Sequence, residues 1–278
     1  MPESRTVSTS AAVLKEIPKP VGARARKLDL SMFTGVAIAL VATAAGIVAT
    51  GLKASYFLQP TGALIVLGGT LGVTILTTPR TGLLHSVRRV AELFWTPDVD
   101  RHALVEEIMG FVKSARTMGL LRLEPIIGRA TNPFLKESLT LTLDVQQRGE
   151  LQSALEMKLR LRERQGESDA KVLEVAGGFA PTIGVLGTVV GLIDVLRQFS
   201  NLQSVASGVG TAFVSTIYGL ALANLILLPA AHRIRTRVAE AFETHEMIME
   251  GVMCIFDKMH PSLVQERLNF FLRESGSE

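Results

Sequence analysis

The chain has 278 residues, 47% of them hydrophobic, and a formal net charge of +3. This apolar content, with a mean hydropathy of +0.33, is typical of a membrane protein. The small and dispersed net charge gives no indication of nucleic-acid binding. The single cysteine, Cys254, excludes an intrachain disulfide, and the five scattered histidines lack metal-ligand spacing.

Residues 1–27 form a basic stretch with no apolar run. We therefore expect a cytoplasmic N-terminal extension and not a cleavable signal peptide. A first transmembrane hairpin is predicted over residues 28–79. Its spans, Leu30–Leu52 and Ala54–Pro79, are uncharged and long enough to cross the hydrocarbon core, and only a few residues around Lys53–Pro60 join them.

A helical cytoplasmic domain is predicted over residues 80–174, which hold more than half of the charged residues. Its apolar residues recur at helical spacing. The two stripes are Leu104, Ile108, Phe111, Val112 and Ala115, followed by Leu139, Leu143, Leu151, Leu155 and Leu159. Helix breakers separate the pieces at Pro97, Gly119, Pro125 and Asn132-Pro133.

A second transmembrane hairpin is predicted over residues 175–232. Its spans are Val175–Ile193 and the apolar part of Gln198–His232. Cytoplasmic C-terminal helices follow over residues 233–278. The fold class is therefore an all-α integral membrane protein with four transmembrane helices in two hairpins.

The basic residues give the orientation. Arginines and lysines lie before the first span, after the second span and after the fourth span. On the opposite side, the basic residues of the short loops are only Lys53 and Arg197. The positive-inside rule places both termini in the cytoplasm.

Small residues line the helix faces of the spans. Glycines at helical spacing let helices approach closely in lipid. The candidate packing positions are Gly68 and Gly72 in the second span, Gly184 and Gly191 in the third, and Gly219 in the fourth.

Two threonines, Thr188 and Thr216, are expected at similar depth on neighbouring spans, because both lie ~20–24 Å from the cytoplasmic ends at 1.5 Å per residue. Their hydroxyls could offer hard oxygens to a small cation. Alternatively, each hydroxyl bonds the carbonyl four residues earlier in its own helix, and the spacing alone favours this second interpretation.

The spans contain no carboxylate in their middle, and Asp194 lies at the edge of the third. An ion path through a membrane normally uses an intramembrane acid. The chain is therefore either half of a two-component channel, with the acid on a partner, or no channel. We find no catalytic, phosphate-binding or metal motif, so neither an enzymatic role nor a cofactor is expected.

Several sequence motifs occur together in order. They are Val66–Gly72, Lys113–Gly119, Gly178–Leu192, Ala212–Gly219 followed by Pro229-Ala230-Ala231, and Glu250–Met253 with Pro261–Leu272. In this order they resemble the MotA-type stator subunits of the bacterial flagellar motor, within the MotA/TolQ/ExbB group. The resemblance covers about residues 28–272 and leaves out the basic extension.

The resemblance implies a homopentamer in the lipid of the bacterial inner membrane. The ring surrounds a dimeric B-type (MotB/PomB-like) subunit whose intramembrane aspartate carries the ion. Arg116 and Glu124 match the charged pair that contacts the rotor switch protein FliG. Pro181 and Pro229 match two prolines tied to conformational coupling.

The resemblance also bears on the transported ion. Sodium-type members carry a threonine at the position of Thr188, where many proton-type members have alanine, and Thr216 with Tyr218-Gly219 is similar to sodium-type sequences. This favours Na⁺ over H⁺ as the transported ion. Two alternatives stay open: a TolQ/ExbB-like energising subunit, against which the first hairpin argues, and a non-conducting scaffold or transporter subunit.

Overall fold

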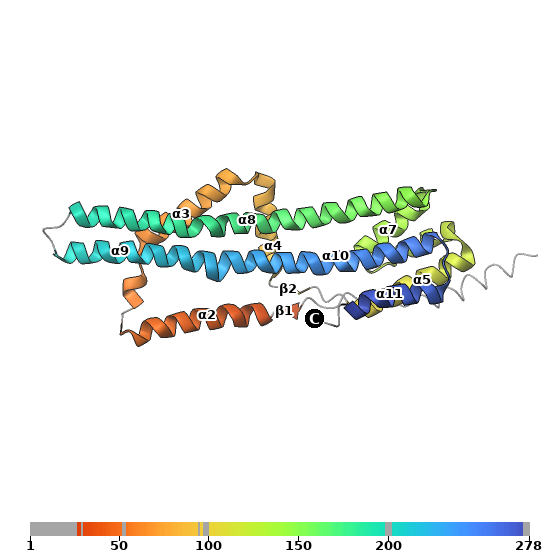
Figure 1. Cartoon of the computed structure of the whole chain (residues 1–278), viewed down its shortest axis with the longest axis horizontal. Coiled ribbons are helices and arrows are strands. Elements are labelled where there is room, and N and C mark those ends of the chain that lie inside the picture. The colour runs from red at the N-terminus through yellow and green to blue at the C-terminus, as the bar shows by residue number, and fades with distance from the viewer. Residues whose placement is uncertain are drawn as a thin grey trace, which may run out of the picture. The chain divides into compact units, whose positions relative to one another are not determined.

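The computed structural model describes residues 27–28, 30–51, 54–93, 95–96, 100–197 and 202–274. Most of these residues are helical (Figure 1). Residues 1–26 of the predicted basic extension and residues 198–201 of the predicted loop between the last two spans lie outside the described part. Two strands of two residues each, β1 (Lys27–Leu28) and β2 (Trp95–Thr96), pair antiparallel.

Thirteen helical elements are found in the described residues. In chain order they are α2 (Leu30–Ala49), η1 (Ala54–Phe57), α3 (Pro60–Thr77), α4 (Arg80–Leu93), α5 (Arg101–Met118), η2 (Leu120–Leu123), α6 (Glu124–Ile127), α7 (Pro133–Asp144), α8 (Arg148–Arg197), α9 (Leu202–Ala221), the π-helical η3 (Leu222–Leu227), α10 (Leu228–Phe256) and α11 (Pro261–Glu274).

The chain divides into two compact units. Unit 1 comprises residues 1–26, 97–164 and 238–278, and unit 2 comprises residues 27–96 and 165–237. The predicted helical, apolar character is confirmed by unit 2. Three of its described helices, Pro60–Thr77, Arg148–Arg197 and Gly208–Phe256, contain stretches long and apolar enough to cross a membrane, and a shorter apolar helix covers Thr34–Ala49. Four spans in two hairpins stay a prediction.

Helix α8 differs from the expectation that a cytoplasmic helix and the third span are separate elements. It is one helix of 50 residues, from Arg148 to Arg197, with Pro181 inside it. The segment before the span is rich in Glu, Arg, Lys, Leu and Gln, which are strong helix formers, and it contains no proline. The helix therefore has no reason to break at the change from polar to apolar sequence.

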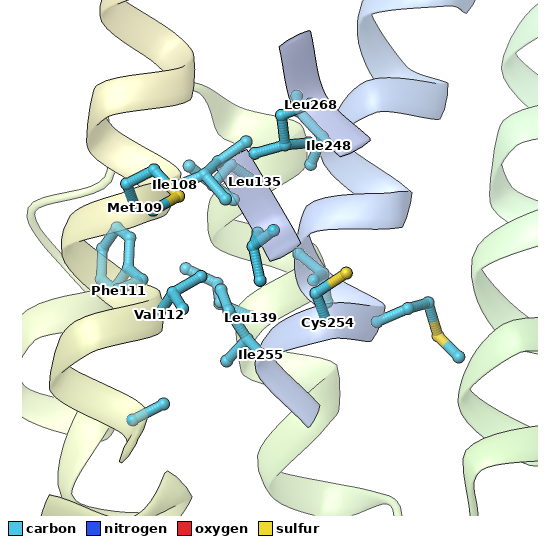
Figure 2. Close-up of a cluster of buried hydrophobic side chains, with 14 of the residues drawn as sticks. Ile108, Met109, Phe111, Val112, Leu135, Leu139, Ile248, Cys254, Ile255 and Leu268 are labelled. Carbon is cyan, nitrogen blue, oxygen red and sulfur yellow. The ribbon is translucent and has the colours of Figure 1, made fainter. Parts of the chain in front are cut away.

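Unit 1 has a hydrophobic core built by α5, α7, the start of α8, α10 and α11 (Figure 2). The labelled side chains Ile108 and Val112 of α5 point toward those of α7, α10 and α11. Both apolar stripes predicted from the sequence lie in this unit, and nine of their ten members are buried. These are Leu104, Ile108, Phe111, Val112, Ala115, Leu139, Leu151, Leu155 and Leu159, and the tenth, Leu143, packs against the core.

The predicted helix boundaries in unit 1 have local causes. The side chain of Asp100 accepts a hydrogen bond from the N–H of Ala103 at 3.1 Å and caps the start of α5. Helix α5 ends before Gly119, whose φ of 85° suits glycine. Asn132 caps α7 by accepting from the N–H of Phe134 at 2.8 Å, and Pro133 occupies the first helical turn.

Candidate functional site

Helices α8 and α9 of unit 2 lie in close contact through small residues. A Cβ atom added at Gly219 would lie 2.5 Å from the carbonyl oxygen of Ala180 and 3.1 Å from the Cα of Gly184. At Gly191 an added Cβ would lie 2.9 Å from the backbone nitrogen of Ala212. Any larger residue would press on the backbone of the other helix, so these glycines determine how closely the two helices approach.

Ser215 packs in the middle of this contact and reaches a third helix. It has no exposed surface. Its Oγ would lie 2.6 Å from a Cβ added at Gly62 of α3 and 2.9 Å from a Cβ added at Gly187 of α8. One residue of α9 therefore fills the space that two glycines leave on different neighbours.

The predicted packing glycines of α3 lie elsewhere. A Cβ added at Gly68 or Gly72 would meet no atom within 4 Å, whereas one at Gly69 would lie 2.7 Å from Ile183 of α8. The buried face of α3 carries Gly62, Val66, Thr70 and Thr74. Residue 68 points ~200° away from residue 70 on a helix. Neither Gly68 nor Gly72 has a close neighbour in the described part of the chain, so helix packing through them stays a prediction.

The structure brings Thr188 of α8 and Thr216 of α9 together. Their hydroxyl oxygens lie 2.5 Å apart. The Thr188 hydroxyl also lies 3.2 Å from the carbonyl oxygen of Gly184 in its own helix and 3.0 Å from that of Ala212 in α9. Thr188 thus makes the contact within its own helix that the spacing favours, and it also makes contacts to α9 that the sequence did not indicate.

These contacts gather four oxygens at one level of the α8–α9 interface. Two are hydroxyl oxygens and two are backbone carbonyl oxygens, and Thr188 is partly buried among them. Each carbonyl has a second lone pair beyond the one used in its helix. An uncharged set of hard oxygens of this kind suits a small hard cation. It offers no carboxylate to carry a proton.

The two prolines lie on the cytoplasmic side of the threonines, as the predicted topology has it. Pro181 is inside α8 and cannot donate a backbone hydrogen bond there. Pro229 is the second residue of α10 and follows the π-helical η3, which closes with a bond from the N–H of Leu228 to the carbonyl of Ala223. A Cβ added at Gly177, one turn before Pro181, would lie 2.8 Å from Leu228. The turns next to the two prolines are therefore in contact.

Arg116 and Glu124 lie in unit 1 and are exposed. Arg116 is in the last turn of α5 and Glu124 begins α6. The short η2 joins these two helices, and Leu123 at its end is fully buried in the core of unit 1. The folded core therefore anchors the segment that carries both charges at the surface.

The sequence analysis missed a set of ion pairs in unit 2. Arg235 of α10 binds Glu174 of α8 with two parallel bonds, one of them 2.8 Å long, and Glu167 at 3.2 Å. Arg237 donates to the last carbonyl groups of α4, with 2.8 Å to that of Leu93. These arginines had been used only to orient the chain. The spacing of seven between Glu167 and Glu174, which places them on one helix face, was the available signal.

Asp169 was also missed, and its side chain is only 1% exposed. One carboxylate oxygen lies 3.4 Å from Nε of Arg89, and the other accepts from Gln165 at 3.1 Å. The hydroxyl of Ser86 donates to the Asp169 carbonyl at 3.0 Å. A buried carboxylate needs such partners, and here they attach α4 to α8. No group of His, Cys, Asp and Glu in the described part of the chain is arranged to hold a metal ion.

Comparisons with known proteins identify relatives of this chain. The model of the MotA/TolQ/ExbB proton channel family matches residues 127–247. Motility protein A of Bacillus subtilis (strain 168) is 26% identical over 250 residues, which cover 88% of this chain and 91% of that protein. Chemotaxis protein PomA of Vibrio alginolyticus is 25% identical over 218 residues, covering 78% of this chain and 85% of PomA.

A solved structure has the same fold. The flagellar MotAB stator complex from Bacillus subtilis contains a chain that superimposes with a TM-score of 0.79 at 26% identity. The match covers 88% of this chain and 98% of that one. The similarity therefore extends over both units.

Proposed function

We propose that this chain is a MotA-type member of the MotA/TolQ/ExbB proton channel family and forms the A-type half of a two-chain ion channel that powers a flagellar motor. The observation that carries the proposal is the cluster of four oxygens around Thr188 and Thr216. It lies in spans that contain no acid, so the chain can line an ion path but cannot complete one.

The missing acid identifies the kind of partner. A B-type subunit would supply an aspartate from its own transmembrane helix, next to the α8–α9 interface. The Bacillus subtilis neighbour is a chain of a MotAB stator complex, which supports such a pairing. In this arrangement several copies of the present chain, five by the resemblance, would surround the partner's helices in the inner membrane, with four spans each and both termini in the cytoplasm.

We assign Na⁺ as the transported ion, with H⁺ as the alternative. A sodium ion is bound by oxygen atoms that donate lone pairs, so each hydroxyl adjacent to the path can contribute to binding it. A proton needs an acid or a water chain and gains less from a threonine pair. The Thr188 hydroxyl can turn its lone pairs to a passing ion, because its proton can point to the carbonyl of Gly184 or of Ala212.

Thr188 gives the test of this assignment. Thr188→Ala removes one oxygen of the four and the contact between the helices, whereas Thr188→Ser keeps the hydroxyl and serves as the matched control. We expect Thr188→Ala to abolish sodium-dependent swimming while the complex still assembles, and Thr188→Ser to retain it. Unchanged swimming of the alanine variant over a sodium titration would refute the sodium assignment.

Ion flow is proposed to turn the ring and push the rotor. The contact would run through Arg116 and Glu124, which are exposed on a firmly packed segment of unit 1 and therefore can transmit force. Pro181 and Pro229 would couple ion passage to helix movement, because both lack a backbone donor and their turns are in contact.

Charge reversal tests the rotor contact. Arg116→Glu or Glu124→Lys should lower motor torque without loss of membrane insertion, since neither side chain is part of the core. Torque is measured on tethered cells, with the level of the protein in the membrane as control. Full torque in both variants would remove the rotor contact from the proposal.

A further inference from the structure

The corner between α2 and α3 is held by one side chain of α9. Within η1 and the two residues that follow it, the backbone leaves the regular helix pattern. The hydroxyl of Tyr218 donates to the carbonyl oxygen of Phe57, and the N–H of Gln59 donates to the same hydroxyl at 3.2 Å. A tyrosine hydroxyl can donate and accept at once, so Tyr218 satisfies an acceptor and a donor that lie two residues apart.

Both backbone groups lie where the chain passes from η1 into α3. Gln59 is the N-cap of α3, its side chain makes no capping bond, and Pro60 begins the helix. Backbone groups at such a junction take their hydrogen bonds from side chains or water. Tyr218 is partly buried against this corner, and its bonds join residues 159 and 161 positions apart in the chain.

Tyr218 and Thr216 lie on opposite sides of α9. Two residues apart on a helix correspond to about 200°, so their side chains leave α9 on opposite sides. Thr216 faces Thr188 of α8, and Tyr218 faces the corner of α3. Ser215, the residue before Thr216, packs against both Gly62 and Gly187. One turn of α9 is thereby fixed from two sides.

We propose that Tyr218 is a positioning residue for the ion site: its hydroxyl fixes the rotation of α9 and thereby holds Thr216 against Thr188. The inference rests on the proposed function. A rotation of α9 by about 20° would move a side-chain oxygen by about 1.5 Å, given the radius of a helix with its first side-chain atoms. This shift exceeds the width of the hydrogen-bond distance range, so it would break up the oxygen cluster.

Tyr218→Phe removes the hydroxyl and keeps the ring. The chain's other tyrosine provides the matched control, because Tyr56 lies in η1 at the same corner and is 59% exposed. We expect Tyr218→Phe to raise the sodium concentration for half-maximal swimming speed by about two- to tenfold, the factor that corresponds to one or two hydrogen bonds. Maximal speed should change little, and Tyr56→Phe should match the wild type. An unchanged half-maximal concentration, or a loss confined to maximal speed, would overturn the proposal.

A second measurement tests the contact between α3 and α9 without any ion. A Cβ at Gly62 would lie 3.6 Å from the Cβ of Ser215, a separation at which a disulfide forms readily. The double variant Gly62→Cys/Ser215→Cys is made with Cys254→Ala, which removes the natural cysteine. Addition of Tyr218→Phe should slow oxidative cross-linking, because α3 is held less firmly on α9. Cross-linking at the original rate would contradict the proposal.

The two readouts separate this proposal from the proposed function. If Thr188→Ala changes the sodium dependence and Tyr218→Phe changes neither readout, only the role of Tyr218 is refuted. If Tyr218→Phe slows cross-linking but leaves the sodium dependence as it is, the tyrosine docks the corner without positioning an ion ligand, and the proposal is overturned. If Thr188→Ala also leaves the sodium dependence unchanged, the sodium path itself is refuted.

Discussion

The hydroxyl of Thr188 has more acceptors within reach than it has protons. Three oxygens lie between 2.5 and 3.2 Å from it, on Thr216, Gly184 and Ala212. Its single proton points to one of them at a time, and its two lone pairs remain as acceptors. A small cation could use such lone pairs, which is the physical reason for proposing an ion path at this level of α8 and α9.

His245 shows a different effect at the residue scale. It lies in unit 1, with its ring 4.3 Å from that of Phe134. Burial, together with the positive charge of Arg162, lowers the pKa of His245 to about 4, and the negative charge of Glu137 partly opposes this shift. The folded state therefore holds this histidine neutral under conditions in which an unfolded chain would protonate it.

This pKa predicts a pH dependence of stability. The folded pKa of about 4 lies below the unfolded value of 6.5, so the contribution is fully present above pH 6.5 and declines as the pH falls toward 4. Denaturant unfolding of the purified chain in detergent should show this decline. His245→Asn should flatten it, and replacement of the exposed His260 by Asn should not. Equal slopes in wild type and His245→Asn would contradict the assignment.

At the scale of elements, close approach of α8 and α9 is the feature on which the site depends. An added methyl group at Gly219 would collide with backbone of α8, at 2.5 Å from the Ala180 oxygen. We expect Gly219→Ala to destabilise the chain by about 1–3 kcal/mol, the usual cost of overpacking. Gly178→Ala is the matched control in α8, because nothing lies within 4 Å of its added Cβ. Thermal unfolding of the chain in detergent distinguishes them, and equal stabilities would argue against the close crossing.

The sequence predicted these elements to different degrees, for physical reasons. Helical periodicity is a local property of the sequence, so it predicted the core stripes of unit 1 and the small-residue faces of α8 and α9. The similar distances of Thr188 and Thr216 from the cytoplasmic ends of their spans predicted that the two residues lie at similar depth. Periodicity could not show whether Gly68 or Gly69 of α3 faces α8, because the two residues differ by only 100° around a helix. Tyr218 was seen only as part of a motif, since its partners are more than 150 residues away in sequence.

At the scale of the whole molecule, the chain combines two units with different physical roles. Unit 1 has a dense apolar core that presents Arg116 and Glu124 at its surface. Unit 2 holds the apolar helices, the oxygen cluster and the ion pairs of Asp169 and Arg235. The proposed ion site lies in unit 2 and the proposed rotor contact in unit 1, as the proposed conversion of ion flow into movement requires.

The central claim is that this chain lines a sodium path that a partner's acid completes. Sodium uptake into vesicles containing the chain with its B-type partner tests it most directly. We predict uptake only when both chains are present, retention of uptake with Thr188→Ser, and a fall to background with Thr188→Ala in a complex of normal composition. Sodium uptake by this chain alone, or undiminished uptake by the Thr188→Ala complex, would contradict the account.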